Sequence, residues 1–395
     1  IIPSVLANFT FALGIPLGHT LTHKYGFKRN YLCFVFIFLI GSILGLLSFH
    51  LIILSIAKMI QSFSSGVLFF TLLPKLFLNF PKQYRNVFLL MVIVGLFGSN
   101  ALGGLSGSLS LELDRWYWLF VVNIISAILC LILGNVILRK NEYHQTSDIH
   151  ISRSMMITLV LSTISLMIPM SLLTQKGYHS LWVWPILLIA IFFIVNFIIT
   201  NRQATHPIVH FHTLFSKKPF VGATMAISSH LTLLTGIAGI NVYIVRILKL
   251  PFDISLHFYF FFFVGVIITG ILKMFFYSSV GAGFLGTLGS SALLYVSIHW
   301  IILGNTINIP LLYIQGLLLG FGASMTLVSG SMATLLDGDL KEAAQRSQTM
   351  HTIRNFSAAM LIPIIAYTIK NHIQKGTQSI YAENITDKMI YLKKL

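Results

Sequence analysis

The sequence is poor in charge, and it is poorest in acidic residues. Of its 395 residues 9% are charged and 56% are hydrophobic, with ten Asp and Glu against 26 Lys and Arg. The mean hydropathy is +0.86. A soluble chain of this length needs far more polar surface to cover its core. The composition therefore excludes a soluble protein and indicates a membrane protein.

Cysteine is also scarce. Cys33 and Cys130 both lie inside apolar runs, and we interpret them as small buried hydrophobic residues, not as a disulfide or a metal pair. The basic residues are scattered singly between apolar runs, which is the ordinary pattern of membrane topology. Despite the net charge of +16, binding of nucleic acid is therefore not expected.

Long apolar runs take the place of polar surface. Runs of about 20 residues are long enough to cross the roughly 30 Å hydrocarbon layer as helices. Because they are continuous rather than alternating, a β-barrel is disfavoured. We expect an all-α polytopic membrane protein with about twelve crossings, at 1–22, 31–49, 51–74, 86–110, 116–138, 153–174, 181–200, 219–248, 255–277, 282–304, 310–335 and 347–370.

The basic residues predict the direction of the crossings. Gly18–Arg29, the break between the first two runs, contains three of them, and positive charge is retained on the cytoplasmic side. With this loop inside, fifteen Lys and Arg fall in inner loops, Lys273 among them, and four in outer loops. Both chain ends then lie outside, which predicts at least one further helix before Ile1 and suggests one after Leu395.

Acidic side chains are missing from the middle of the runs, where proton-driven pumps usually keep one. All ten lie in loops, near helix ends or in the tail. Histidine titrates unaided near neutral pH, so His230 could relay protons; a neutral histidine bonded to a neighbouring helix is the alternative. For Lys58 and Arg354 the alternative is a side chain that reaches to one face of the membrane. The polar residues expected at mid-membrane are Lys58, Gln61, Asn100, Asn123, His230, Asn241, Tyr243 and Arg354.

Sites for metals, cofactors or catalysis are not apparent. His206, His210 and His212 have the spacing of metal ligands, but Pro207 interrupts a helix between them and no carboxylate or cysteine lies close. An amphipathic segment at the membrane surface explains them better. No Ser-His-Asp order, P-loop or glycine fingerprint occurs in a usable context. We expect no metal, no cofactor and no enzyme activity.

The break between the first two runs resembles a motif of a known family. Gly18–Arg29 is similar to the cytoplasmic loop motif of the major facilitator superfamily, Gly-x-Leu-Ala-Asp-Arg-x-Gly-Arg-Arg. Leu21, Gly26 and Lys28 match it, while His23 and Lys24 stand in place of its Asp and Arg. The resemblance implies a loop that gates the cytoplasmic face through His23, Lys24, Gly26, Lys28 and Arg29.

Later segments resemble motifs of one branch of that superfamily, the fourteen-helix drug:proton antiporters of the EmrB/QacA type. Lys58-Met-Ile-Gln61-Ser62 resembles its Arg-x-x-Gln-Gly stretch, with Lys and Ser as replacements. Ser99-Asn100-Ala-Leu-Gly103-Gly104 resembles Gly-Pro-x-x-Gly-Gly. Trp116-Tyr-Trp118-Leu-Phe120-Val-Val-Asn123 is similar to Trp-Arg-Trp-x-Phe-x-x-Asn, the most specific signature. His206-Pro-Ile-Val looks like Asn-Pro-Ile-Val, and Arg354 matches an Arg of the penultimate helix.

The resemblance implies a major facilitator fold of two helical bundles with two extra linking helices. In that branch the loop motif lies between helices two and three, so this chain would hold helices two to thirteen, in agreement with the outside chain ends. The implied parts are an N-terminal bundle without its first helix at 1–138, a linking loop with two extra helices at 139–200, a C-terminal bundle at 201–370 and an extracytoplasmic tail at 371–395.

The resemblance also implies a function: proton-coupled export of hydrophobic, drug-like compounds across a bacterial inner or plasma membrane by alternating access. The polar residues expected at mid-membrane would then line the substrate cavity and proton path, and the proton gradient would supply the energy. Implied partners are hydrophobic small molecules, protons, the lipid bilayer and an adaptor protein in the periplasm. Two alternatives stay open: a degenerate, non-transporting homologue that acts as an interaction partner, and a membrane-embedded enzyme that modifies lipids.

Overall fold

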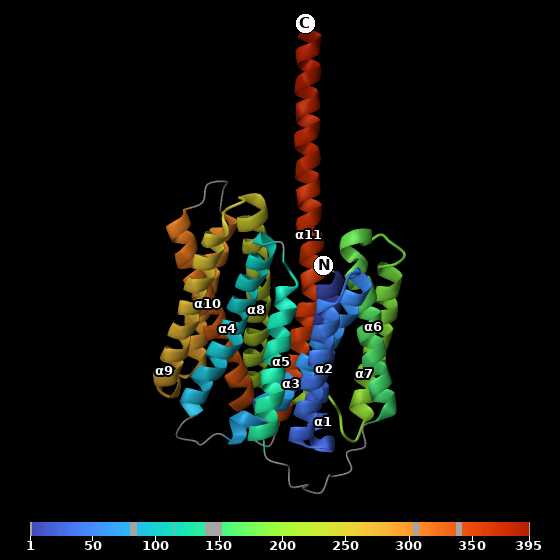
Figure 1. The fold of residues 1–395 in the computed structure, drawn as a ribbon, viewed down its shortest axis with the longest axis vertical. Coiled ribbons are helices and arrows are strands. Elements are labelled where there is room, and N and C mark those ends of the chain that lie inside the picture. Colours follow the sequence, from blue (N-terminus) through green and yellow to red (C-terminus); the bar gives the residue numbers. More distant parts are fainter. Residues whose placement is uncertain are drawn as a thin grey trace.

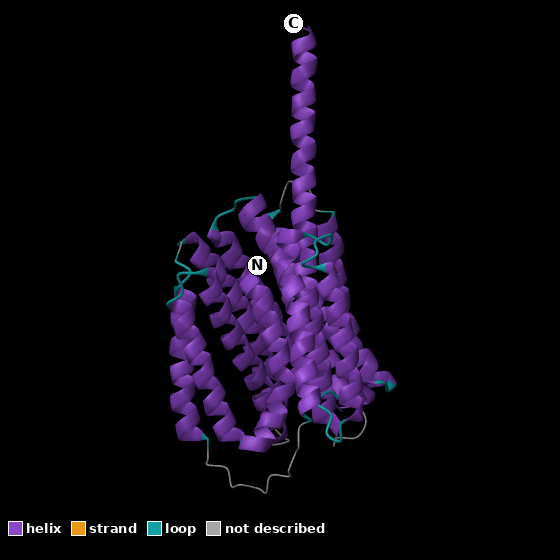
Figure 2. Cartoon of the chain, turned by 90° about the vertical axis from the view of Figure 1, so that its right-hand side faces the viewer, coloured by secondary structure: helices purple, strands orange, loops and turns teal. Residues whose placement is uncertain are grey.

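The computed structural model describes residues 2–79, 85–113, 115–138, 152–302, 308–336 and 342–394, and within these ranges it contains helices and no strand (Figures 1 and 2). The twelve predicted crossings each correspond to one helix or one arm of a helix. The helices are α1 Ile2–Tyr25, α2 Phe27–Leu46, α3 Leu51–Asn79, α4 Arg85–Glu112, α5 Trp118–Ile137, α6 Arg153–Lys176, α7 Trp184–Gln203, η2 Phe211–Leu214, α8 Lys217–Asn241 with its π-helical extension η3 Val242–Ile247, α9 Phe252–Ile301, α10 Ile309–Leu336 and α11 Ala343–Lys394.

Helix α9 is a hairpin of two antiparallel arms. Its chain turns at Gly281, whose φ of 80° and ψ of 170° are not helical, and a positive φ is a conformation that glycine adopts at little cost. The first arm runs parallel to α10, since Phe258 lies beside Gly316 and Phe262 beside Gly320. The second arm runs the opposite way. The ninth and tenth predicted crossings are therefore the two arms of α9.

Both chain ends lie toward one side of the bundle, which we call the terminal side, and α11 projects from it (Figure 1). The opposite side, where α1 ends and α8 and α11 begin, is the far side. An even number of crossings requires this arrangement. Ten of the described helices are long and apolar enough to cross a membrane, and α1 contributes the shorter apolar helix Ile2–Gly18.

The lipid-facing surface accounts for many exposed apolar side chains. On α5, Val136 and Ile137 are 77% and 67% exposed, as expected for a helix that faces hydrocarbon on one side. The two cysteines also lie on exposed positions. Our expectation that Cys33 and Cys130 are buried was therefore wrong, because an apolar run in a membrane protein can also face lipid or, as Cys130 does, a cavity.

Two helix pairs make the largest contacts between the N-terminal and the C-terminal helices. Helix α4 packs along the first arm of α9, and α1 packs along α11. We call α1–α5 the N-terminal set and α8–α11 the C-terminal set. Within the N-terminal set, α3 packs against α1 and α2; within the C-terminal set, α10 packs against α8 and α9. Helices α6 and α7 form a pair that lies beside α1 and α11 (Figure 1).

Lys273 corrects one part of the charge count. We assigned it to an inner loop, but it lies in the first arm of α9 and is 0% exposed. Its Nζ donates a hydrogen bond of 2.6 Å to Ser329 Oγ on α10, and it lies 5.7 Å from the centre of the Tyr277 ring. The predicted crossing 255–277 already contains this residue, so counting Lys273 among the inner loops was wrong.

We expect the Lys273–Ser329 pair to show energetic coupling. Ser329→Ala leaves a buried amine without this partner and should cost about 1–3 kcal/mol. Lys273→Met removes the buried polar group and keeps the volume, so it should cost little or stabilise. The double variant should therefore unfold at a higher temperature than Ser329→Ala, as measured by thermal unfolding in detergent. Additive effects of the two substitutions would contradict this coupling.

Candidate functional site

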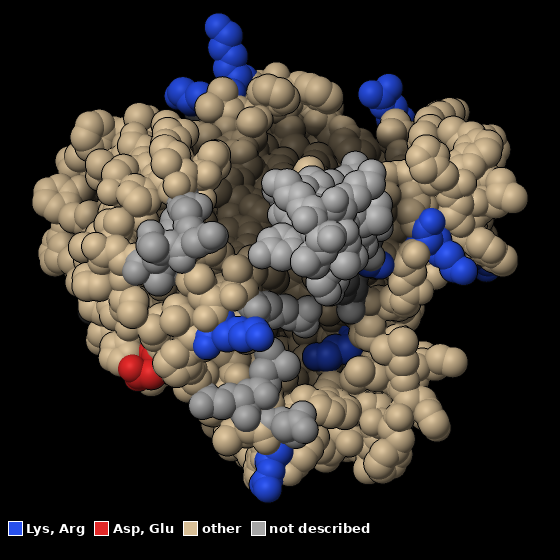
Figure 3. Space-filling view, turned by 90° about the horizontal axis from the view of Figure 1, so that it is seen from above, with Lys and Arg blue, Asp and Glu red and all other residues tan. Residues whose placement is uncertain are grey.

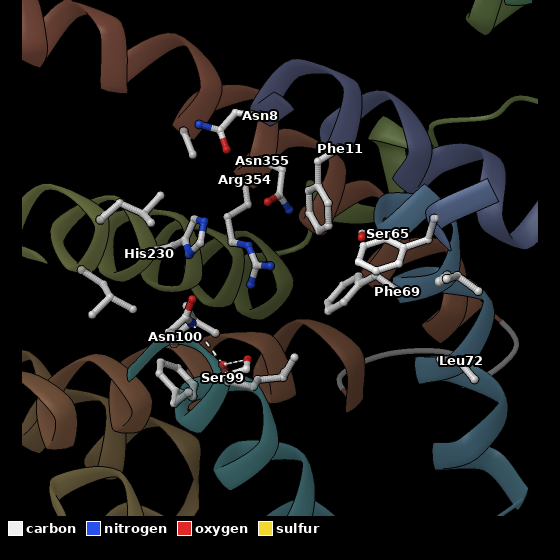
Figure 4. Close-up of a pocket in the computed structure, with 18 of the residues that line it drawn as sticks. Asn8, Phe11, Ser65, Phe69, Leu72, Ser99, Asn100, His230, Arg354 and Asn355 are labelled. Carbon is white, nitrogen blue, oxygen red and sulfur yellow. Dashed lines mark hydrogen bonds between the residues drawn. The ribbon is translucent and has the colours of Figure 1, made fainter. Parts of the chain in front are cut away.

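A cavity of about 610 Å³ lies between the N-terminal and C-terminal helices (Figure 4). This volume suits a drug-sized ligand. Seen from the terminal side, the molecule is hollowed near its centre (Figure 3). Most lining residues are apolar or aromatic, and those that carry polar side chains are Asn8, Ser65, Ser99, Asn100, Ser126, His230, Arg354 and Asn355.

His230 and Arg354 meet at mid-depth in this cavity. His230 lies 13 residues after the start of α8 and Arg354 lies 11 residues after the start of α11, which is about 20 and 17 Å along the helix axes. Figure 4 shows the imidazole and the guanidinium side by side, with Asn100 of α4 nearby. Two helices that are far apart in the sequence thus bring these side chains together.

Among the described residues, Arg354 has no counter-ion. It is 7% exposed, and its buried Nε has no hydrogen-bond partner. The next residue, Asn355, donates from Nδ2 to the carbonyl oxygen of His351 over 2.8 Å. Residues 351, 354, 355 and 358 share one face of α11, because side chains three and four positions apart lie on the same side of a helix.

Contacts between the two sets of helices close the far side below the cavity. Gln348 of α11 donates from Nε2 to the carbonyl oxygen of Pro16 on α1 over 2.6 Å. The His351 ring lies edge-on to Phe69 and Phe70 of α3, with ring centres 5.1 and 6.2 Å apart. These contacts join α11 to α1 and α3 across the interface.

The residues predicted at mid-membrane divide into two groups. Asn100, His230 and Arg354 line the cavity, whereas the other five are absent from its described lining. Gln61 donates to Ser42 over 2.7 Å between α3 and α2, and Lys58 lies 4.7 Å from the centre of the Phe120 ring. Asn241 accepts a 2.8 Å hydrogen bond from Tyr259 Oη, Tyr243 packs against the core of the C-terminal helices, and Asn123 is half-buried on α5. In this conformation, their role in the substrate path stays a prediction.

Sequence reasoning missed several lining residues, among them Asn8, Ser65 and Ser126. Single small polar side chains in an apolar run carry little signal, because they also occur at ordinary helix contacts. His351, just below the cavity, was missed as well. The spacing of Gln348, His351 and Asn355 on one face of α11 could have indicated it.

The predicted gating loop joins helices of the N-terminal set. Gly26 adopts φ 81° between α1 and α2, and Lys28 Nζ donates to the carbonyl oxygen of Asn135 on α5 over 2.7 Å. Lys24 lies 5.3 Å from the Tyr25 ring centre. Arg29 is exposed beside them, and the side chain of His23 lies outside the described residues. The gating role itself stays a prediction.

The histidine segment between α7 and α8 is hydrogen-bonded to α7 and to α11. Asn201 accepts hydrogen bonds of 3.1 Å from the backbone N–H groups of Ile208 and Val209, and the backbone N–H of His210 donates to Thr349 Oγ1 on α11 over 3.0 Å. Burial lowers the pKa of His210, and His212 lowers it further. Within the described ranges, no three His, Cys, Asp or Glu side chains gather closely enough to bind a metal ion.

Comparison with known proteins points to one class. The chain is 24% identical over 369 residues to the uncharacterized MFS-type transporter YubD of Bacillus subtilis. The matched residues make up 92% of this chain and 71% of YubD. It is 28% identical to multidrug resistance protein 3 of Bacillus subtilis, over 55% of this chain and 43% of that protein. It is 26% identical to quinolone resistance protein NorB of Staphylococcus aureus, over 60% of this chain and 50% of NorB. The chain thus spans half or less of the length of these last two relatives.

The fold has a counterpart among solved structures. A crystal structure of an auto-inhibited POT family peptide transporter matches with a TM-score of 0.54 at 14% identity, over 95% of this chain and 82% of that one. No family model matches the chain. The relatives and the structural neighbour are transporters, not enzymes. The chain is therefore an integral, multi-pass, all-α membrane protein with the major facilitator fold, and its homologues are MFS-type transporters.

Proposed function

We propose that this protein exports hydrophobic small molecules across a bacterial plasma membrane by alternating access, coupled to inward proton flow. The observation that carries the proposal is the mid-depth cavity, because both sets of helices contribute to it and it holds the half-buried His230 beside the buried Arg354. Multidrug resistance protein 3 and quinolone resistance protein NorB are named for drug resistance, which supports export as the direction.

The two ends of the cavity support a switching mechanism. With the loops rich in Lys and Arg in the cytoplasm, the terminal side faces outward. On the opposite side, Gln348 contacts Pro16 and His351 contacts Phe69. We propose that these contacts separate when the protein takes up substrate from the cytoplasm, while the α4–α9 and α1–α11 pairs act as the surfaces along which the two sets of helices rock.

His230 is the residue that we propose for the proton. Imidazole takes up and releases a proton near neutral pH without help from neighbours, and no Asp or Glu is found among the described lining residues. Asn100 and Asn355 would bind polar groups of the substrate, and the lining aromatic side chains would cover its apolar part. Lys58, Gln61, Asn123, Asn241 and Tyr243 remain candidates for the path in other conformations.

A transport assay tests this proposal. The full-length protein, reconstituted in vesicles with an imposed pH gradient, is expected to move a hydrophobic dye, and His230→Ala should change the pH dependence of the rate. His257→Ala is the matched control, since His257 is exposed at the outer end of α9 and contacts Asp253 over 3.2 Å. A vesicle that moves no dye would favour the non-transporting homologue. An unchanged pH profile would remove His230 from the proton path.

A further inference from the structure

The charge of the central cavity has one sign. Its lining brings together the guanidinium of Arg354 and the imidazole of His230, and among the described lining residues none is Asp, Glu or Lys. His351, which is buried about one helical turn before Arg354 on α11, adds a second imidazole beside the cavity. The cavity is therefore electrically unlike a site for organic cations, which needs a carboxylate or an open aromatic cage.

In the described part of the chain, Arg354 has no partner of the kind that a buried guanidinium requires. The described residues include no hydrogen bond or ion pair to it, and its Nε is buried and unpaired. The two carboxylates whose side chains are described lie elsewhere: Asp253 contacts His257 over 3.2 Å, and Glu342 contacts Arg346 over 3.7 Å. An unpaired buried charge is costly, and a charge of opposite sign within hydrogen-bond reach removes most of that cost.

The remaining walls suit an apolar body. Phe11 and Phe69 face the guanidinium from the N-terminal helices (Figure 4), and the lining also contains leucines from α3, α4, α8 and α10. Asn355 and Asn100 each donate one amide hydrogen bond to their own helix, to the carbonyl oxygens of His351 and Leu96. Each side-chain NH₂ group keeps a second hydrogen that can be donated to a ligand.

We infer that this cavity binds amphipathic organic anions, compounds with one carboxylate or sulfonate group on a hydrophobic, aromatic body. The acidic group would pair with the planar fork of Arg354, which matches such groups with two parallel hydrogen bonds. The aromatic body would lie between the phenylalanine and leucine side chains. The inference rests on the proposed function only in taking this cavity as the substrate site.

A pair of probes that differ in the acidic group tests this inference. The first is 8-anilinonaphthalene-1-sulfonate, and the second is N-phenyl-1-naphthylamine, which has the same aromatic body and no charge. Binding is measured by fluorescence in nanodiscs of zwitterionic lipid, with empty nanodiscs as background. Wild-type protein should bind the sulfonate more tightly. Arg354→Gln should weaken sulfonate binding by about tenfold or more and leave binding of the neutral probe nearly unchanged.

Two further variants provide an intermediate case and a control. Arg354→Lys keeps the positive charge but not the planar fork. Its affinity for the sulfonate should therefore lie between those of wild type and Arg354→Gln. Arg202→Gln, at the exposed end of α7, removes an arginine far from the cavity and should bind both probes as wild type does. If Arg354→Gln does not fold, competition on wild-type protein decides: 1-naphthoate should displace the sulfonate far better than its neutral analogue 1-naphthylmethanol.

The outcomes separate this inference from the proposed function. Equal affinity of wild type for both probes, or unchanged sulfonate binding in folded Arg354→Gln, would overturn the anion site. If vesicles then still move a neutral dye, transport stands and the anion preference fails. If the sulfonate is preferred through Arg354 but no compound is moved, the anion site stands and the transport proposal fails.

Discussion

Cross-linking α3 to α11 below the cavity is expected to stop transport completely. Phe69 and His351 face each other across the interface between the two sets of helices, with ring centres 5.1 Å apart. A cysteine pair at these positions, joined by a short bis-methanethiosulfonate reagent, would prevent their separation. Transport in vesicles should fall to the level of empty vesicles and return after reduction, because alternating access requires the closed side to open.

The cross-linking experiment needs a protein without its native cysteines and a control cysteine pair within one set of helices. Cys33 and Cys130 are exposed, so both are first replaced by Ala. The control pair replaces Phe34 and Phe63, whose ring centres lie 6.1 Å apart between α2 and α3; both helices belong to the N-terminal set. Cross-linking this pair should leave transport nearly unchanged. If the Phe69–His351 link also left transport intact, the two sets of helices would not separate at this point.

Gly320→Val is expected to cause the largest loss of stability. A side chain at Gly320 of α10 would collide with the backbone of Phe262 on α9, and Gly265 on α9 meets the backbone of Leu317 in the same way. Small residues let two membrane helices approach this closely. Because backbone atoms cannot move aside, the isopropyl group that valine adds should lower the free energy of unfolding by about 3 kcal/mol or more. Thermal unfolding in detergent and the monodisperse fraction on gel filtration measure the effect.

Gly103→Val is the matched control. Both glycines lie in long apolar helices, but a side chain at Gly103 of α4 would meet no atom within 4 Å. Valine is slightly better than glycine in a helix, so the change should be within a few tenths of a kcal/mol. A similar loss in both variants would indicate that glycine acts through helix flexibility and not through the close approach of α9 and α10.

The glycines show what a sequence pattern can and cannot predict. Clusters in the fourth and eleventh predicted crossings look alike in the sequence, and both are typical of packed membrane helices. In the structure Gly316 and Gly320 meet the backbone of α9, whereas Gly95, Gly103 and Gly107 have open space around them. Which face of a helix is covered depends on its neighbours, and the spacing of small residues along one helix does not specify those neighbours.

Lys273 and Arg354 show that the burial of a basic residue is equally hard to predict from its own apolar run. Each is a single basic residue in an apolar run, and reach to the membrane surface was an alternative for Arg354. The structure buries both, one against Ser329 and the other beside His230. The cost of burying a charge is set by partners on other helices, which a single run does not reveal.

By itself, the sequence determined the class of protein, the number and approximate positions of the crossings and the motifs that resemble the major facilitator superfamily. These follow from hydropathy and charge along the chain, because each crossing must satisfy its own backbone in lipid whatever its neighbours are. Tertiary structure alone decided that His230, Arg354 and Asn100 share one cavity while Gln61 and Asn241 serve contacts between helices. The reason is geometric: side chains on helices far apart in sequence meet through packing, which is a property of pairs of helices.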